Sequence, residues 1–200
     1  PRYRGYTYLS LVAELEPSGP EEAQALSLIR EWDLHSDTAN RKAALGVCIL
    51  LEEWQAERTG NPLPDARETL QTCMESVRDV AGQLNPEWGA VQQHGRGQRT
   101  WPAAGGPDTL RAMYAEQLED EDDFLTVVAG DGLYYLIEWN AEGEQTIRGT
   151  HQYGSQMTDE SSPHYLDQAE SFSQEIMRAP GFYPENRSAT SKRYTVTSAD

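Results

Sequence analysis

Histidine, aspartate and serine lie close together in one segment of the sequence. His164 and Asp167 are three residues apart, and Ser155, Ser161 and Ser162 precede them. These are the residue types of a hydrolytic triad, in which an aspartate orients a histidine that deprotonates a serine. Triads are normally assembled from distant loops, and the sequence has no Gly-x-Ser-x-Gly turn to expose a nucleophile. The simpler interpretation is a helix N-terminus, with His164 bonded to backbone groups.

The spacing of the candidate metal ligands does not favour a metal site. His35, His94, His151 and His164 form neither a His-x-x-x-His nor a His-Glu-x-x-His pattern, so no zinc site is expected. The acidic run 119–123 lacks the alternating aspartates and the distal glutamate of a calcium loop, and it is interpreted as a solvated turn. We therefore expect this chain to bind no metal and no cofactor.

A glycine-rich turn is the last local candidate for a binding site. The run Gly105-Gly106-Pro107-Asp108-Thr109 precedes an expected short helix that carries Leu110, Met113 and Tyr114. Free N–H groups at such a turn would suit an anion. The run lacks the Gly-Lys-Ser/Thr of a phosphate-binding loop, so it is interpreted as a tight turn with Asp108 as the helix cap.

The overall charge excludes one class of partner. The 200 residues carry 33 Asp and Glu against 16 Lys and Arg, a formal net charge of −17. A protein this acidic is not expected to bind nucleic acid through a basic face. The longest apolar stretch, 43–51, is far shorter than the roughly 18 residues of a membrane span, so no membrane span is expected.

The first part of the chain, 1–84, is predicted to be helical. Apolar residues recur at helical spacing in three segments: near 19–32, from about Ser36–Thr38 to Gly60, and from Asp65 to Leu84. Cys48 and Cys73 both fall on apolar stripes of these helices. They are either free buried thiols or partners in a disulfide, and the sequence alone leaves both readings open.

The second part, 85–180, changes to a strand pattern. Its first residues, 85–107, are predicted to be loop with one short strand at most. Three strands are then expected as an antiparallel meander: Leu125–Ala129, Leu133–Trp139 and Gln145–Tyr153. Leu133–Ile137 is apolar on both alternating faces, which predicts a sheet covered on both sides. A helix from residue 162 to just before Pro180 and a polar tail at 181–200 complete an α+β chain.

The second half of the sequence carries a series of short motifs: Trp88-Gly89-x-Val91, Arg96-Gly97, Trp101-Pro102, Gly105–Ala112, Gly130-Asp131, His151–Ser155 and Ser161–Gln168. Upstream of them lie Ile29–Asp33 and the long helix with Trp54. Taken in order, these segments resemble the C-terminal part of the penicillin acylase (penicillin amidase) family, most closely its acyl-homoserine-lactone and aculeacin A acylases, and the likeness spans about 25–180.

This resemblance implies an N-terminal-nucleophile hydrolase, whose precursor cuts itself into a small and a large subunit. In such enzymes the first serine of the large subunit attacks the amide, its own α-amino group acts as base, and an Asn with backbone N–H groups holds the oxyanion. The family's catalytic residues lie before the stretch that resembles this chain. None therefore maps onto it, and the chain alone is expected to be an inactive C-terminal fragment of the large subunit.

The fold implied by the resemblance is a four-layer αββα sandwich. The implied partners are an N-acylated small-molecule substrate, the small acylase subunit and the missing N-terminal part of the large subunit; periplasmic or secreted localisation is implied in the same way. Gly132 and the pair Gly149-Thr150 depart from the family pattern, which weakens the subgroup assignment. Two alternatives stay open: a non-catalytic binding module that has kept the fold, and a local hydrolase built on His164 and Asp167.

Overall fold

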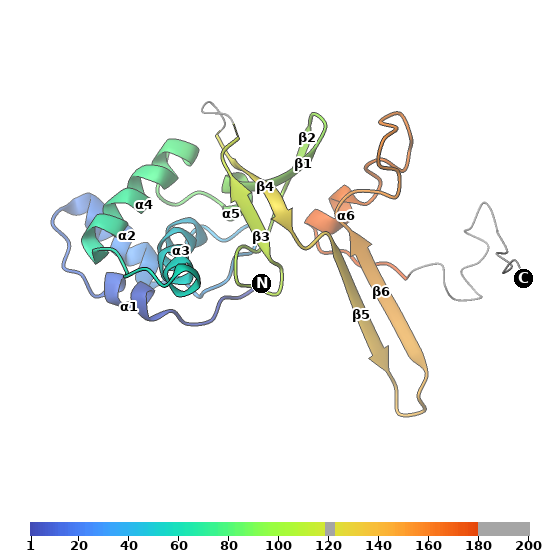
Figure 1. Cartoon of the computed structure of the whole chain (residues 1–200), viewed down its shortest axis with the longest axis horizontal. Coiled ribbons are helices and arrows are strands. Elements are labelled where there is room, and N and C mark those ends of the chain that lie inside the picture. The colour runs from blue at the N-terminus through green and yellow to red at the C-terminus, as the bar shows by residue number, and fades with distance from the viewer. Residues whose placement is uncertain (119–122, 180–200) are drawn as a thin grey trace, which may run out of the picture. The chain divides into compact units, whose positions relative to one another are not determined.

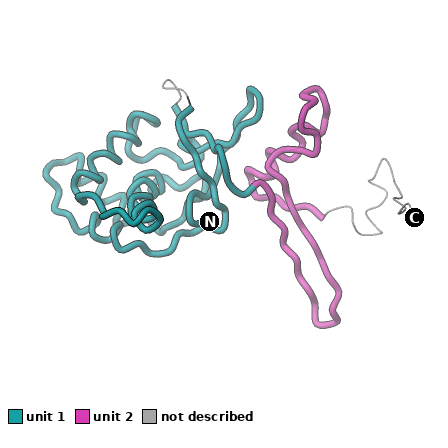
Figure 2. Tube along the Cα trace, in the orientation of Figure 1, with its two compact units in different colours: residues 1–131 teal, residues 132–200 magenta. Residues whose placement is uncertain are grey.

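The computed structural model describes residues 1–118 and 123–179 and confirms the α+β class (Figure 1). By its contacts the chain divides into two units, 1–131 and 132–200 (Figure 2). The boundary between the two units lies well after residue 84, where the composition of the sequence changes. That change marks only the end of the first four helices of the first unit. No helix in the described ranges has the length and hydropathy needed to cross a bilayer.

Four helices form the core of the first unit: α1 (Thr7–Ala13), α2 (Pro20–Arg30), α3 (Ala43–Thr59) and α4 (Ala66–Ala81). Their inner faces bury one continuous cluster of apolar side chains. α2 and α4 lie where the apolar spacing predicts them. The Asp65 carboxylate accepts the N–H groups of Arg67 and Glu68, at 3.0 and 3.1 Å, which caps α4 as expected.

Two details of the helical prediction are wrong. α3 begins at Ala43 rather than between Ser36 and Thr38, because side-chain and backbone bonds hold 37–42 as turns; the Asn40 side chain, for example, accepts the N–H of Lys42 at 2.9 Å. α1 was not predicted. It is only two turns long, and its buried residues Tyr8, Leu9 and Val12 are too few to show a helical period.

A disulfide joins the two longest helices. Cys48 of α3 and Cys73 of α4 are bonded, with their Cα atoms 5.8 Å apart. Of the two states that the sequence leaves open, the structure has the bridged one.

The close packing of α3 on Trp32 gives a first testable prediction. A Cβ added at Gly46 would lie 2.0 Å from the ring of Trp32, which is itself buried. We expect Gly46→Ala to lower the free energy of unfolding by about 2 kcal/mol, because the ring must move within a packed core. Gly5→Ala is the control, since a Cβ there meets nothing within 4 Å. Equal chemical-denaturation midpoints for the two variants would contradict this packing.

The rest of the first unit is a short helix and a four-stranded sheet in the order β2-β1-β4-β3. The elements are α5 (Trp88–Val91), β1 (Gln92–Arg96), β2 (Arg99–Pro102), β3 (Met113–Glu116) and β4 (Leu125–Gly130). β1 runs parallel to β4, and the other pairs are antiparallel.

This sheet corrects three sequence predictions. Residues 85–107 contain a helix and a hairpin rather than mostly loop, and the segment after Asp108 is strand β3 rather than a helix. The predicted meander is also wrong, because β4 pairs with β1 and β3 and not with the next strand. Asp131 fixes this arrangement: its N–H donates to the Ala112 carbonyl at 2.8 Å, and its carboxylate accepts the Ala112 N–H at 2.9 Å.

The second unit is a hairpin with a small helix. β5 (Leu133–Trp139) pairs along its whole length with β6 (Gln145–His151), and α6 spans Ala169–Ser173. α6 is much shorter than the helix predicted from residue 162, because residues 162–168 form turns instead. The predicted tail, 181–200, lies outside the described residues.

One face of β5 is bare, contrary to the predicted cover on both sides. Tyr134, on the opposite face, stacks on Phe172 of α6 with ring centroids 5.2 Å apart. The alternate residues share the other face, and each is between 42 and 64% exposed. This bare face consists of Leu133, Tyr135, Ile137 and Trp139.

Candidate functional site

The structure brings His164 and Asp167 together but does not assemble a triad. The Nδ1 atom of His164 lies 3.0 Å from the Asp167 carboxylate. Two of the nearby serines have other partners: the Ser161 hydroxyl donates to Asp159 at 2.6 Å, and the Ser162 hydroxyl accepts the backbone N–H of His164 at 3.2 Å. The expectation that the His164 ring bonds backbone groups at a helix start is therefore corrected, since its partner is a carboxylate in a turn.

The two motifs around these residues pack against each other. The N–H of Gln168 donates to the Tyr153 carbonyl at 2.8 Å, and the N–H of Gln156 donates to the His164 carbonyl at 3.1 Å. A Cβ on Gly154 would lie 2.0 Å from that same carbonyl oxygen, so only glycine fits between the two segments. The order and spacing of these motifs therefore correspond to a packing contact between two segments of the second unit.

In the glycine-rich turn at 105–109, the N–H groups of both glycines are bonded within the protein. The N–H of Gly105 donates to the Ser36 carbonyl at 2.9 Å, and the N–H of Gly106 donates to the Arg111 carbonyl at 3.2 Å. Asp108 has φ of 58° and precedes no helix, so its predicted role as a helix cap is wrong.

Asp108 instead joins the N-terminal segment to the turn. The hydroxyl of Tyr6 and the Nε atom of Arg4, the latter at 3.1 Å, both donate to its carboxylate. The Tyr6 hydroxyl and the Arg4 guanidinium lower the pKa of Asp108, while burial and the bond to Asp108 raise the pKa of Tyr6 to about 12. Arg4 also donates to Glu57 of α3 at 2.6 Å, so the cluster ties three segments together.

This cluster predicts a pH-dependent contribution to stability. Because folding lowers the pKa of Asp108, its contribution is present above the unfolded value near 4 and is lost as the pH falls through the folded value. Asp108→Asn retains a residue type that tolerates positive φ. We expect the variant to lose less than about 1 kcal/mol at neutral pH, since the carboxylate is exposed, and to approach the wild type as the pH falls below the folded pKa of Asp108.

Thermal unfolding of both proteins across this pH range is the measurement. Asp123→Asn removes another exposed carboxylate and serves as the control. A wild-type advantage that grows as the pH falls would contradict the assignment.

The remaining histidines are not brought together. His94 is fully buried and stacks on Trp101 with centroids 5.6 Å apart; burial and the charge of Arg111 lower its pKa to about 4, so it is a neutral core residue. Within 1–118 and 123–179, no three His, Cys, Asp or Glu residues lie close enough to hold a metal ion. Four residues of the acidic run, 119–122, lie outside the described residues.

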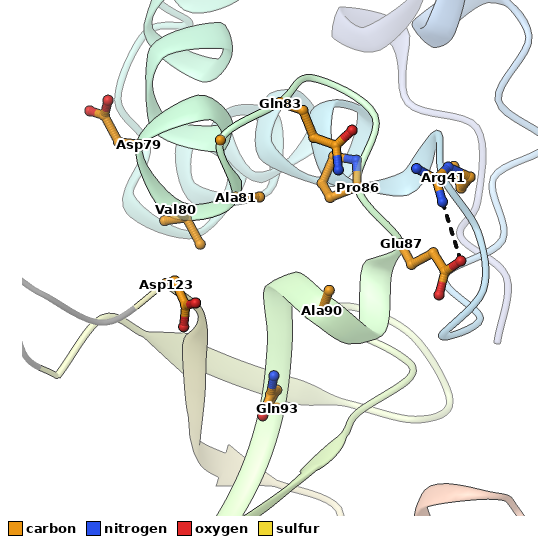
Figure 3. Close-up of a pocket in the computed structure, with 11 residues that line it drawn as sticks. Arg41, Asp79, Val80, Ala81, Gln83, Pro86, Glu87, Ala90, Gln93 and Asp123 are labelled. Atoms are coloured by element: carbon orange, nitrogen blue, oxygen red, sulfur yellow. Dashed lines mark hydrogen bonds and ion pairs between the residues drawn. The ribbon is translucent and has the colours of Figure 1, made fainter.

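An open hollow of about 580 Å³ lies in the first unit, and sequence analysis did not find it. Its lining comes from Arg41, the C-terminal end of α4, the following loop, α5, β1 and Asp123, which lies two residues before β4 (Figure 3). Its polar lining residues are Arg41, Asp79, Gln83, Glu87, Gln93 and Asp123. Arg41 is paired with Glu87 at 3.2 Å. No motif marks these residues, because they are ordinary surface types contributed by segments far apart in the chain.

A smaller apolar slot shares a wall with this hollow. The slot has a volume of about 140 Å³, and its lining is almost entirely carbon. Val80 of α4 borders both spaces. The described lining of the hollow holds no serine, threonine, cysteine or histidine, so its residues are suited to binding a ligand rather than to attacking one.

Comparison with known protein families places the chain. The family model described as penicillin amidase matches residues 4–189, which is nearly the whole chain. The chain therefore belongs to the penicillin amidase family.

Proposed function

We propose that this chain is the C-terminal part of the large subunit of an amide hydrolase that removes acyl chains from N-acylated small molecules. Family membership carries this proposal, since it covers residues 4–189. The substrates proposed are N-acyl homoserine lactones, lipopeptides or penicillin-like amides. An N-terminal serine in an upstream segment supplies the nucleophile, with its α-amino group as base.

The second unit supports a missing partner segment. The bare face of β5 holds four large apolar side chains, and soluble proteins rarely leave such a patch uncovered. A further β-layer or helix from the upstream segment would cover it, as in the proposed αββα sandwich. The local hydrolase is the weaker candidate, because the hydroxyls of Ser161 and Ser162 are bonded away from the His164 ring.

The disulfide supports export to the periplasm or beyond. Disulfides persist in oxidising compartments and are rare in reducing ones. The Cys48–Cys73 bond therefore fits a secreted or periplasmic enzyme. The acyl-homoserine-lactone and aculeacin A acylases remain the proposed subgroup.

The decisive experiment is the intact mass and N-terminal sequence of the mature protein, isolated from its source cells with an antibody to this chain. A subunit that begins with Ser, Thr or Cys and contains residues 4–189 near its end supports the hydrolase. That protein should release fatty acid from an N-acyl homoserine lactone, and its His164→Ala variant should retain this activity. A mature protein that starts at Pro1 would leave the mechanism without its nucleophile and would favour a non-catalytic binding module.

A further inference from the structure

The apolar slot beside the hollow has the size and lining of a ligand site. Its walls come from α3, α4 and α5, through Val47, Leu51, Val77, Val80, Trp88 and Val91. A water molecule needs two to four polar partners, and this lining offers almost none. Cavities of roughly 150 Å³ with such walls stay dry and accept a molecule the size of benzene.

The adjoining hollow determines which polar group such a ligand would carry. Val80 lines both the slot and the hollow, and Asp123 lines the hollow, where Figure 3 places it across from the Arg41–Glu87 pair. Because Arg41 is already paired with Glu87, the carboxylates of Asp79 and Asp123 leave the hollow with a net negative charge. In Figure 3 the Asp79 side chain points away from the other lining residues, so Asp123 is the carboxylate expected to meet a ligand. The C-terminal end of α4 also borders the hollow and presents the negative end of the helix dipole.

We propose that the slot and the hollow together bind a small organic amine. Its apolar group of about six carbon atoms fills the slot, and its ammonium group lies in the hollow near Asp123. This site does not depend on the amide hydrolysis proposed above. All of its residues belong to the first unit of this chain, whereas the proposed nucleophile lies in an upstream segment.

A matched series of three ligands tests both halves of the site on the full 200-residue chain. Phenethylamine, phenethyl alcohol and hydrocinnamate share a phenyl group and an ethylene linker but end in a cation, a neutral hydroxyl and an anion. Dissociation constants come from ligand-observed NMR titrations at concentrations where light scattering shows a monomer. We expect the amine to bind about threefold more tightly than the alcohol, as a partly screened carboxylate allows, and the anion to bind most weakly.

Two variants assign this binding to the site. Ser76 lines the slot from an exposed position, so Ser76→Phe should fill the slot and abolish binding of all three ligands. Asp123→Asn should reduce the affinity for the amine to that for the alcohol. Glu75→Gln is the control: it removes an exposed α4 carboxylate that lines neither space, and it should change nothing.

Three results would overturn the proposal. They are no binding of any ligand, equal affinities across the series, and undiminished binding in a Ser76→Phe variant with wild-type circular dichroism. If Ser76→Phe does not fold, Asp123→Asn still decides the charge preference, because its side chain is exposed and its removal leaves the core intact.

Discussion

Reduction of the Cys48–Cys73 disulfide is expected to lower the free energy of unfolding of the first unit by about 3 kcal/mol. The two cysteines are 25 residues apart, so the bond restricts a loop of that length in the unfolded chain. Cys73 is buried, and reduction leaves its thiol within the α3–α4 contact. The expected fall in the unfolding midpoint is about 10 °C for a unit of this size.

The measurement is thermal unfolding with and without a reductant, with free thiols counted by mass spectrometry. The variant Cys48→Ser/Cys73→Ser is the matched control: it should unfold at the lower temperature in both conditions. Identical midpoints for the oxidised and the fully reduced wild type would show that the bond contributes nothing to this unit.

The helices could be predicted where their signals are local. The predicted end of α4 at Leu84 is too late, because the helix ends at its cap, Gly82, which has φ of 69°. Its apolar period and its aspartate cap at Asp65 were predicted correctly. These signals depend on neighbouring residues alone, so the sequence shows them directly. The cysteine pairing is different, because it depends on how α3 and α4 pack and not on either helix by itself.

The strands show where local signals fail. Gly130-Asp131-Gly132 has the composition of a hairpin turn, which suggested that β4 and β5 pair. The bonds of Asp131 to Ala112 instead hold β4 beside β3, a contact between residues 19 apart. The length of β5 was predicted correctly. Its apolar faces indicated that other residues should pack on both sides of the strand, but they did not indicate whether those residues belong to this chain.

The candidate site could not be predicted for a related reason. Its residues range from Arg41 to Asp123 and come from two loops, two helices, strand β1 and the segment before β4. None is of an unusual type, and only the fold brings them together. The family motifs were found because they are contiguous, yet in the structure the residues around Gly154 and His164 position each other rather than a ligand.

The bare face of β5 is expected to make the isolated chain self-associate. Its four apolar side chains are each about half exposed, so burial of the remaining surface would contribute about 1 kcal/mol for each. Because the described part of the chain leaves this face uncovered, copies of the chain should bury it against each other, and the open strand edge favours the same outcome. Replacing Ile137 and Trp139 with lysine should shift the chain to monomer and reduce the binding of an apolar dye severalfold.

A matched double variant and a longer precursor test whether the bare face itself, rather than the added charge, accounts for the change in self-association. Thr146→Lys/Glu142→Gln makes the same change of charge at exposed positions off the bare face, and it should leave self-association unchanged. In a precursor that carries the upstream segment, Ile137→Lys/Trp139→Lys should have the opposite effect and prevent assembly, because two ammonium groups would then be buried at the covered face. A wild-type chain that is monomeric, binds no dye and unfolds in one sharp transition would refute the prediction of self-association. It would also show that the bare face needs no cover, and the face would then no longer support a missing partner segment.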